Sequence, residues 1–134
     1  ILGYGKGQIA ELMRKVYGPG VEITGVDLVP QNYSYNEYKM KICDAYDYVK
    51  ACSNSLIKRR YDYVVIDLFG NDNKHPDFIF NADFASMIRQ ITKRLLCINV
   101  YAQRFDKLKS YTNYGFKFHR FVPIFENCVC FWGV

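Results

Sequence analysis

No stretch of this 134-residue chain approaches the roughly 20 apolar residues that a membrane span requires, although 50% of its residues are apolar and 17% are aromatic. The chain also does not open with a basic segment followed by an apolar one, which is the pattern of a secretory leader. We therefore expect no membrane partner and a cytoplasmic location. A chain of this length can bury one core, so a single domain over residues 1–134 is predicted.

Patterns that bind metal ions are missing too, and we predict no metal site. The five cysteines fall mostly inside apolar runs, which favours buried free thiols and a reducing, intracellular setting. Cys128 and Cys130 lie two apart on a predicted strand, but no second pair and no histidine cluster completes a zinc site. The two imidazoles are His75, expected in an exposed loop, and His119, expected to be structural.

Basic charge is not concentrated on one segment. The formal net charge is +5, and residues 58–60 (Lys-Arg-Arg) form the single dense cluster, which is typical of a solvated helix end. No nucleic-acid recognition motif accompanies the charge, so a small molecule is the expected partner and a nucleic acid is the alternative. The composition is also compatible with a homo-oligomer.

Apolar periodicity predicts strands that alternate with helices. Helices are predicted over residues 8–17, 45–58, 81–94 and 103–114, and strands over residues 1–2, 22–27, 39–43, 61–68 and 95–101. Two last strands, 116–122 and 128–132, are too close together for a crossover helix and should form an antiparallel hairpin. The predicted fold class is α/β, a doubly wound and mostly parallel sheet with one antiparallel strand in the C-terminal hairpin.

Three further expectations follow from the same pattern. A first strand of only two residues is short, so we expect further residues upstream of Ile1. The apolar run at 63–66 suits a central parallel strand that is covered on both faces, and Leu56 should share the buried face of the helix at 45–58. The polar segment 71–81 is the natural lid or substrate loop over the strand ends.

A glycine-rich turn links the first strand to the first helix. Gly3, Gly5 and Gly7 can take positive φ and let a ligand approach the main chain, because they lack a Cβ. The helix that follows offers free N–H groups and the positive end of its dipole. The turn therefore predicts a binding site for a cofactor, although a tight turn without a ligand has the same residues.

Three successive strands end in aspartate. Asp27 follows the glycine turn by about 20 residues, the spacing at which a carboxylate accepts hydrogen bonds from a ribose diol. Asp44 and Asp67 close the next two strands. Each alone could be a helix cap or a loop anchor, but the carboxyl ends of neighbouring parallel strands converge on one crevice.

This pattern resembles the class I S-adenosylmethionine-dependent methyltransferase superfamily, and within it the spermidine synthase-like branch, over essentially the whole chain. The resemblance rests on Gly3-x-Gly5-x-Gly7, Asp27, Asp44-Ala45 and the run at 61–69. Pro76, the strand containing Asn99 and the closing hairpin with Asn127 also fit. It implies a Rossmann-like fold and S-adenosylmethionine, or its decarboxylated form, as cofactor.

The resemblance also implies a role for each motif residue. The three glycines would face the methionine part of the cofactor, and Asp27 would bind the ribose with Leu28 against the adenine. Asp44 would accept a bond from the adenine amino group, and Ala45 would offer its N–H to a ring nitrogen.

The same family pattern places Asp67 nearest the sulfonium and implies that Asp67 and the neighbouring Leu68 both bind the cofactor. Asp67 would be the catalytic residue, because aminopropyltransferases use an aspartate there to orient and deprotonate an amine.

One residue departs from the aminopropyltransferase pattern. Lys6 stands where that branch usually has an aspartate. A cation that points inward there favours ordinary S-adenosylmethionine, which has a carboxylate, over the decarboxylated form, whereas a lysine that points to solvent would not distinguish them. The upstream substrate-binding hairpin domain of that branch is also absent from these residues. We therefore expect a methyltransferase that acts on an unidentified acceptor, with aminopropyl transfer as the alternative.

Two further functional classes share parts of this pattern. A nicotinamide dinucleotide domain would need a third glycine or alanine where Gln8 stands. A methyltransferase fold without catalysis could serve as a binding or assembly module, with tyrosines lining its partner surface. The tyrosines considered for that surface are Tyr33, Tyr35, Tyr38, Tyr46 and Tyr48.

Overall fold

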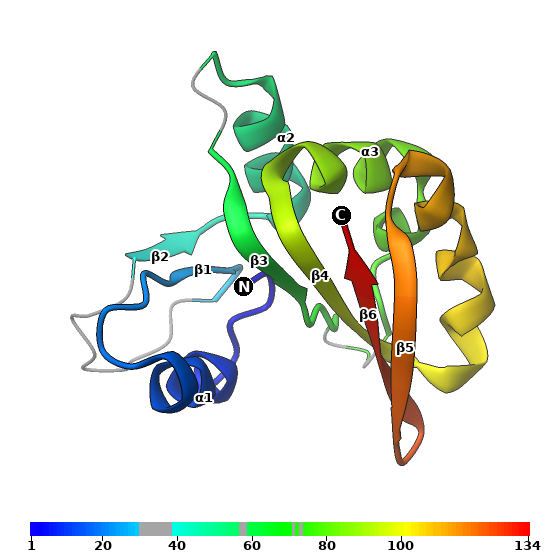
Figure 1. The fold of residues 1–134 in the computed structure, drawn as a ribbon, viewed down its shortest axis with the longest axis horizontal. Helices are drawn as coiled ribbons and strands as arrows, with labels where there is room; N and C mark the ends of the chain where they lie inside the picture. The colour runs from blue at the N-terminus through cyan, green and yellow to red at the C-terminus, as the bar shows by residue number, and fades with distance from the viewer. Residues whose placement is uncertain (30–38, 57–58, 71, 73) are drawn as a thin grey trace.

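A twisted sheet runs through the molecule in the computed structural model, which describes residues 1–29, 39–56, 59–70, 72 and 74–134 (Figure 1). Its strands are β1 (Thr24–Asp27), β2 (Lys39–Ile42), β3 (Tyr61–Ile66), β4 (Thr92–Tyr101), β5 (Lys117–Ile124) and β6 (Asn127–Gly133). Leu2 makes parallel bridges to Val26 and Ile66, which join the pair β1–β2 to the four strands β3-β4-β6-β5. β6 runs antiparallel to both β4 and β5, so the predicted hairpin is confirmed.

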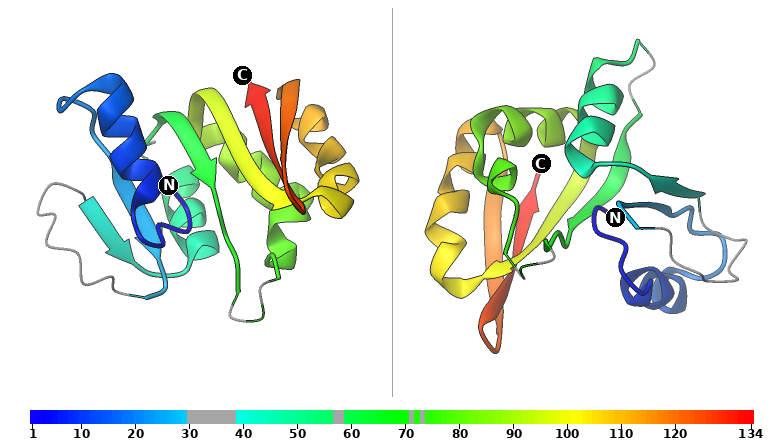
Figure 2. Two further views of the ribbon diagram at one scale, coloured as in Figure 1. Left: turned by 90° about the horizontal axis from the view of Figure 1, so that it is seen from below. Right: turned by 180° about the vertical axis from the view of Figure 1, so that it is seen from behind.

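The helices form two unequal layers. They are α1 (Gln8–Tyr17), α2 (Ala45–Asn54) and α3 (Ala82–Ile91), with the 3₁₀ segments η1 (Asp77–Phe80) and η2 (Ala102–Tyr114). α3 packs against both α2 and η2 on one face of the sheet, whereas α1 lies on the other face beside β1 (Figure 2). The predicted α/β architecture is therefore confirmed. Among the described residues, no helix is long and apolar enough to cross a membrane.

The main core lies between the sheet and the layer of α2, α3 and η2. Alternate residues of the strands point into it, as the two-residue period of a strand requires. Fully buried examples are Val64 and Ile66 of β3, Leu96, Ile98 and Val100 of β4, and Cys130 and Trp132 of β6. A smaller core of Tyr4, Ala10 and Ile23 packs α1 against β1.

The prediction that β3 is covered on both faces is wrong. Val64 and Ile66 are buried, but Asp62 is exposed and Tyr63 keeps 37% of its surface. The reason is that α1 lies on this face and covers it only in part. Tyr17 of α1 contacts Tyr63, with ring centroids 5.6 Å apart, but does not bury it.

Two predicted helix ends are also wrong. α2 stops at Asn54 and Ser55 is extended, so Leu56 is fully exposed instead of sharing the buried face. Residues 57–58 lie outside the described residues, and Arg60 bonds the carbonyl of Thr92 instead of ending a helix. α3 stops at Ile91 because Thr92 already has strand dihedrals, and β4 begins there without a connecting loop.

The segment expected as a helix at 103–114 forms 3₁₀ turns. Its core-facing residues Phe105, Leu108, Tyr111 and Tyr114 recur every third position, which is the period of a 3₁₀ helix rather than of an α-helix. Tyr111 is fully buried, and its hydroxyl donates to the carbonyl of Ile79 at 2.8 Å.

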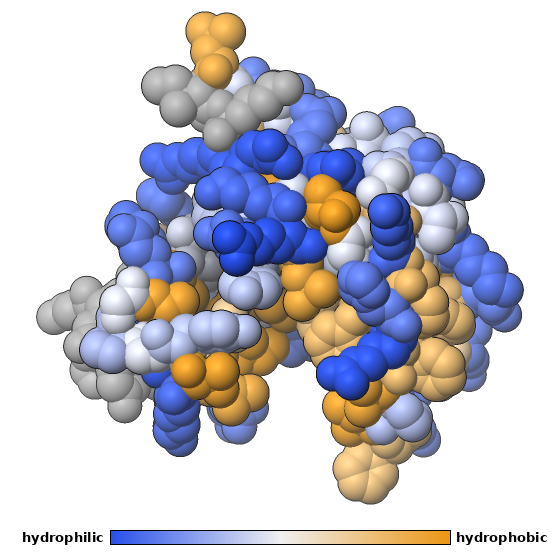
Figure 3. All heavy atoms as spheres, in the orientation of Figure 1, coloured by the Kyte–Doolittle hydropathy of each residue, from blue (hydrophilic) through white to orange (hydrophobic). Residues whose placement is uncertain are grey.

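The sheet face that α1 covers only in part has two kinds of surface. Hydrophilic side chains lie over the amino ends of β3 and β4, where Arg60, Lys93 and Arg94 are exposed (Figure 3). Apolar side chains gather on the β5–β6 hairpin, whose tip residue Phe125 is fully exposed with a positive φ of 53°.

Candidate functional site

Hydrogen bonds connect the carboxyl ends of four neighbouring strands. The N–H of Cys43, after β2, donates to the Asp27 carbonyl at 3.0 Å, and the N–H of Gly3 donates to the Val26 carbonyl at 2.9 Å. The N–H of Asp67, after β3, donates to the Leu2 carbonyl at 2.8 Å. The glycine turn and the three strand-end aspartates therefore lie along one edge of the sheet.

The three glycines of the turn all have positive φ, but for different reasons. A Cβ on Gly3 would clash with the carbonyl oxygen of Asp67, so this glycine allows the first strand to approach the end of β3. Gly7 is the N-cap of α1 and lies against the ring of Tyr4. A Cβ on Gly5 would meet nothing within 4 Å. Gly5 is therefore the point of the turn that a ligand could approach.

Asp27 holds the glycine turn in place. One carboxylate oxygen accepts from the N–H of Gly5 at 2.9 Å and the other from the N–H of Val29 at 3.1 Å. Each carboxylate oxygen has a second lone pair, so both can accept a further bond from a ligand diol. Leu28, the apolar residue next in the chain, is 68% exposed and can cover a flat ligand ring.

Asp44 caps α2. Its Oδ1 accepts from the N–H groups of Tyr46 at 2.7 Å and Asp47 at 3.2 Å, and this leaves Oδ2 able to accept another donor. Ala45 is the first helical residue, and a first-turn N–H has no partner within its own helix. The cap and the adenine contacts implied by the resemblance therefore use different atoms.

We expect Asp44→Ala to lower the free energy of unfolding by about 1 kcal/mol, because the cap bonds are lost. Asp44→Ser is the matched control, since serine also caps but has no carboxylate. Urea unfolding followed by fluorescence of the buried Trp132 measures both changes. An alanine variant as stable as the serine variant would contradict the capping role.

Asp67 is half-buried and is oriented by β4. The side-chain amide of Asn99 donates to Asp67 Oδ1 at 2.8 Å. Asn99 Oδ1 is buried and has no hydrogen-bond partner among the described residues. A carboxylate and an unpaired amide oxygen thus lie together, and both accept hydrogen bonds. The pairing is not apparent from the sequence; the signal for it is one amide inside an otherwise apolar strand.

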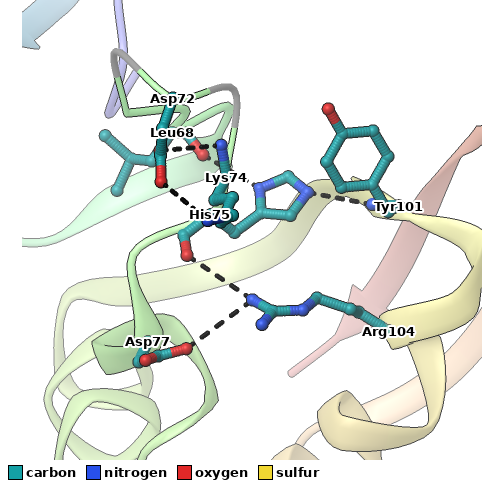
Figure 4. Close-up of polar contacts among 7 residues, drawn as sticks. All are labelled: Leu68, Asp72, Lys74, His75, Asp77, Tyr101 and Arg104. Atoms are coloured by element: carbon teal, nitrogen blue, oxygen red, sulfur yellow. Dashed lines mark hydrogen bonds and ion pairs between the residues drawn. The ribbon is translucent and has the colours of Figure 1, made fainter.

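His75 is not the exposed loop residue that the sequence suggests, because only 3% of its surface is accessible. Its Nδ1 lies 2.9 Å from the Leu68 carbonyl, and its Nε2 accepts from the N–H of Tyr101 at 2.9 Å (Figure 4). The rings of Phe69 and Tyr101 lie 4.3 and 5.0 Å from the imidazole. With both nitrogens bonded, His75 cannot act as a base toward a ligand.

The segment around His75 is packed rather than open. It contains η1 and the buried Ile79, and Arg104 approaches both the His75 carbonyl, at 3.5 Å, and Asp77, at 3.6 Å (Figure 4). Of the two roles predicted for 71–81, an open lid does not agree with this packing of the described residues, whereas a substrate loop stays a prediction; 71 and 73 lie outside the described residues. His75 connects this segment to the sheet, since it bonds Leu68 after β3 and Tyr101 at the end of β4.

The thiols near the site are not activated. Burial raises the pKa of Cys43, and the neighbouring Asp44 adds to this rise. Burial raises the pKa of Cys97 to about 11, with a further contribution from Asp67. Both are therefore thiols rather than thiolates at neutral pH. In the described part of the chain, no group of three His, Cys, Asp or Glu residues could hold a metal ion.

Lys6 lies in the glycine turn, at this same edge of the sheet, and is exposed. Tyr33, Tyr35 and Tyr38 lie outside the described residues, whereas Tyr46 and Tyr48 pack at the border of the main core. A hollow of about 610 Å³ lies at the amino ends of β1 and β3, between residues such as Ile23, Tyr63 and Arg94, and not beside the aspartates.

No protein-family model matches the chain, and no curated protein sequence does. Solved structures do match. Magnesium protoporphyrin IX methyltransferase (ChlM) from Synechocystis PCC 6803, with bound S-adenosylmethionine, superposes with a TM-score of 0.66 at 14% identity, over 98% of this chain and 67% of that one.

A TehB-like S-adenosylmethionine-dependent methyltransferase from Corynebacterium glutamicum ATCC 13032 Kitasato matches with a TM-score of 0.59 at 18% identity. The match covers 98% of this chain and 76% of that protein. At these identities the likeness concerns the fold. The chain has the Rossmann-like fold of S-adenosylmethionine-dependent methyltransferases.

Proposed function

We propose that residues 1–134 form a single domain that binds S-adenosylmethionine and transfers its methyl group to a small-molecule acceptor. The observation that carries the proposal is the line of Asp44, Asp27, Gly5 and Asp67 along the carboxyl edge of a methyltransferase-like sheet. When bound, S-adenosylmethionine supplies an electrophilic methyl group. Ligands of open parallel sheets bind at this edge, which agrees with the proposal.

The residues present fit such a cofactor. The open side of Gly5 leaves room for the methionine part, and Gly3 and Gly7 keep the turn close to the sheet. Asp27 has lone pairs left for the ribose hydroxyls, and the exposed Leu28 lies next to it for the adenine.

The second strand end completes this fit. Asp44 Oδ2 can accept from the adenine amino group, and the N–H of Ala45 can reach a ring nitrogen. Leu68, the residue after Asp67, is proposed as a further cofactor contact.

Asp67 is the proposed catalytic residue. Its carboxylate is fixed by Asn99 and can accept a proton from a nucleophile that lies between it and the cofactor. We propose that the chain lies near the spermidine synthase-like branch, since Asp67 and Asn99 both belong to the motifs on which that resemblance rests.

Lys6 distinguishes the two forms of the cofactor. Its exposed ammonium stands in the turn that would hold the amino-acid end, where it attracts a carboxylate and repels a lone ammonium. We therefore propose ordinary S-adenosylmethionine, and methyl transfer rather than aminopropyl transfer.

Calorimetric titration tests the proposal directly. We expect S-adenosylmethionine to bind at micromolar concentration, its decarboxylated form to bind more weakly, and NAD not to bind. Lys6→Ala should reduce the difference in affinity between S-adenosylmethionine and its decarboxylated form. Lys50→Ala, which removes an exposed lysine from α2, should leave that difference unchanged. If neither sulfonium compound binds at high micromolar concentration, the proposed function is wrong. Tighter binding of the decarboxylated form would favour aminopropyl transfer.

A further inference from the structure

His75 ties together the two strand ends that carry Asp67 and Asn99. Leu68, whose carbonyl faces His75 Nδ1, is the residue after Asp67, and Tyr101, whose N–H reaches Nε2, is two residues beyond Asn99 (Figure 4). The direct bond between Asp67 and Asn99 lies beside this link. The imidazole therefore fixes the spacing across which that bond forms.

Only one form of the imidazole makes both bonds. A carbonyl oxygen needs a donor at Nδ1, and a backbone N–H needs an acceptor at Nε2. The neutral ring with its proton on Nδ1 satisfies both. A second proton on Nε2 would place two donors face to face and break the bond to Tyr101.

We propose that His75 is a positioning residue, which holds Asp67 against Asn99 only while its imidazole is neutral. The inference rests on the proposed function for the role of Asp67, but the link itself does not. His75 touches no reacting group; it acts through the backbone at Leu68 and Tyr101.

The surroundings of His75 favour the neutral ring. Burial is the largest effect and lowers the pKa of His75 below its ordinary value of 6.5. The Leu68 carbonyl and the Asp67 carboxylate, from the end of β3, act in the opposite direction, and Arg104 of η2 adds to the lowering. Phe69, Phe80 of η1 and Tyr101 enclose the ring with aromatic groups.

The direction of the pH effect follows from this lowered pKa. The folded protein binds the His75 proton less readily than the unfolded chain, so the link contributes fully above about pH 6.5. Its contribution is lost as the pH falls through the lower pKa of the folded state. The Asp67–Asn99 geometry should therefore change as the pH falls through the lowered pKa of His75.

Nitrogen-15 NMR of the full chain tests the link without any ligand. We expect the His75 ring to show the Nδ1–H tautomer, a scalar coupling from Nε2 to the Tyr101 amide nitrogen, and a titration midpoint below 6.5. The Nε2–H tautomer, or a midpoint at or above the ordinary value, would overturn the proposal.

The side-chain amide of Asn99 reports whether the link positions Asp67. In the wild type, the chemical shifts of this amide should change with pH at the same midpoint as His75. Those of the exposed Asn54, at the end of α2, should show no change at that midpoint. His75→Gln keeps an acceptor for the Tyr101 N–H that cannot be protonated, so the pH-dependent change in the Asn99 signals should disappear. His75→Asn keeps only the donor toward Leu68 and should shift the Asn99 signals at every pH.

The two proposals fail in different ways. Asn99 signals that ignore the His75 titration in the wild type would refute the positioning role, even if S-adenosylmethionine binds. Absence of S-adenosylmethionine binding above pH 7, with the NMR pattern intact, would refute the proposed function and leave the link established.

Discussion

Replacing Gly3 with alanine is expected to lower the free energy of unfolding by about 2–5 kcal/mol. Two costs combine. The residue has a φ of +80°, which L-residues adopt with difficulty, and its new Cβ would clash with the Asp67 carbonyl. Relief of the clash would separate the first strand from the end of β3, where Leu2 accepts from the Asp67 N–H at 2.8 Å.

Gly5→Ala is the matched control for this prediction. Gly5 also has a positive φ, of 50°, but a Cβ there would meet nothing within 4 Å, so the cost should be about 1–2 kcal/mol. Denaturant unfolding of the two variants, read from Trp132 fluorescence, measures the difference. Equal losses would mean that the close approach to Asp67 contributes nothing and that backbone conformation alone requires the glycines.

The local signals in the sequence predicted the elements whose ends are set by neighbouring residues. The predicted bounds of α1 coincide with the observed ones because Gly7 and Gly18, both with positive φ, stop the helix on either side. Elements whose bounds depend on distant partners were predicted less well. The exposed face of β3 at Tyr63 reflects how little of α1 lies over it, which periodicity within β3 does not report.

The candidate site shows the same division. The aspartates could be located from the sequence because topology brings the carboxyl ends of parallel strands to one edge. His75 could not, because its burial depends on Tyr101, 26 residues further along the chain, and on the ring of Phe69. The pairing of Asp67 with Asn99 spans 32 residues and is likewise a product of the β3–β4 register.

The aspartate that ends β1 anchors a loop and is also proposed to bind the cofactor, and either role would account for its place in the sequence. Asp27 anchors the loop, since its oxygens accept from Gly5 and Val29, and the same carboxylate keeps lone pairs for the proposed cofactor. The anchoring orients the carboxylate before a ligand arrives, which reduces the entropy lost on binding.

We therefore expect Asp27→Ala to weaken S-adenosylmethionine binding by at least about 100-fold, because hydrogen bonds to a charged acceptor each contribute about 1.5–3 kcal/mol. The loss has two sources: the acceptors for the ribose hydroxyls disappear, and the N–H of Gly5 no longer has the partner that orients the turn. Calorimetric titration above pH 7 gives the affinity, and a urea unfolding curve of the same variant shows whether the fold persists.

Asp62→Ala is the control for the loss of one negative charge. Asp62 lies at the amino end of β3, pairs with Lys93 and Arg94 at 3.9 and 3.7 Å, and is remote from the glycine turn. Its removal should leave cofactor affinity within about twofold, since exposed ion pairs contribute little. If Asp27→Ala folds and binds S-adenosylmethionine as tightly as Asp62→Ala does, Asp27 is a loop anchor only and the cofactor does not occupy this crevice.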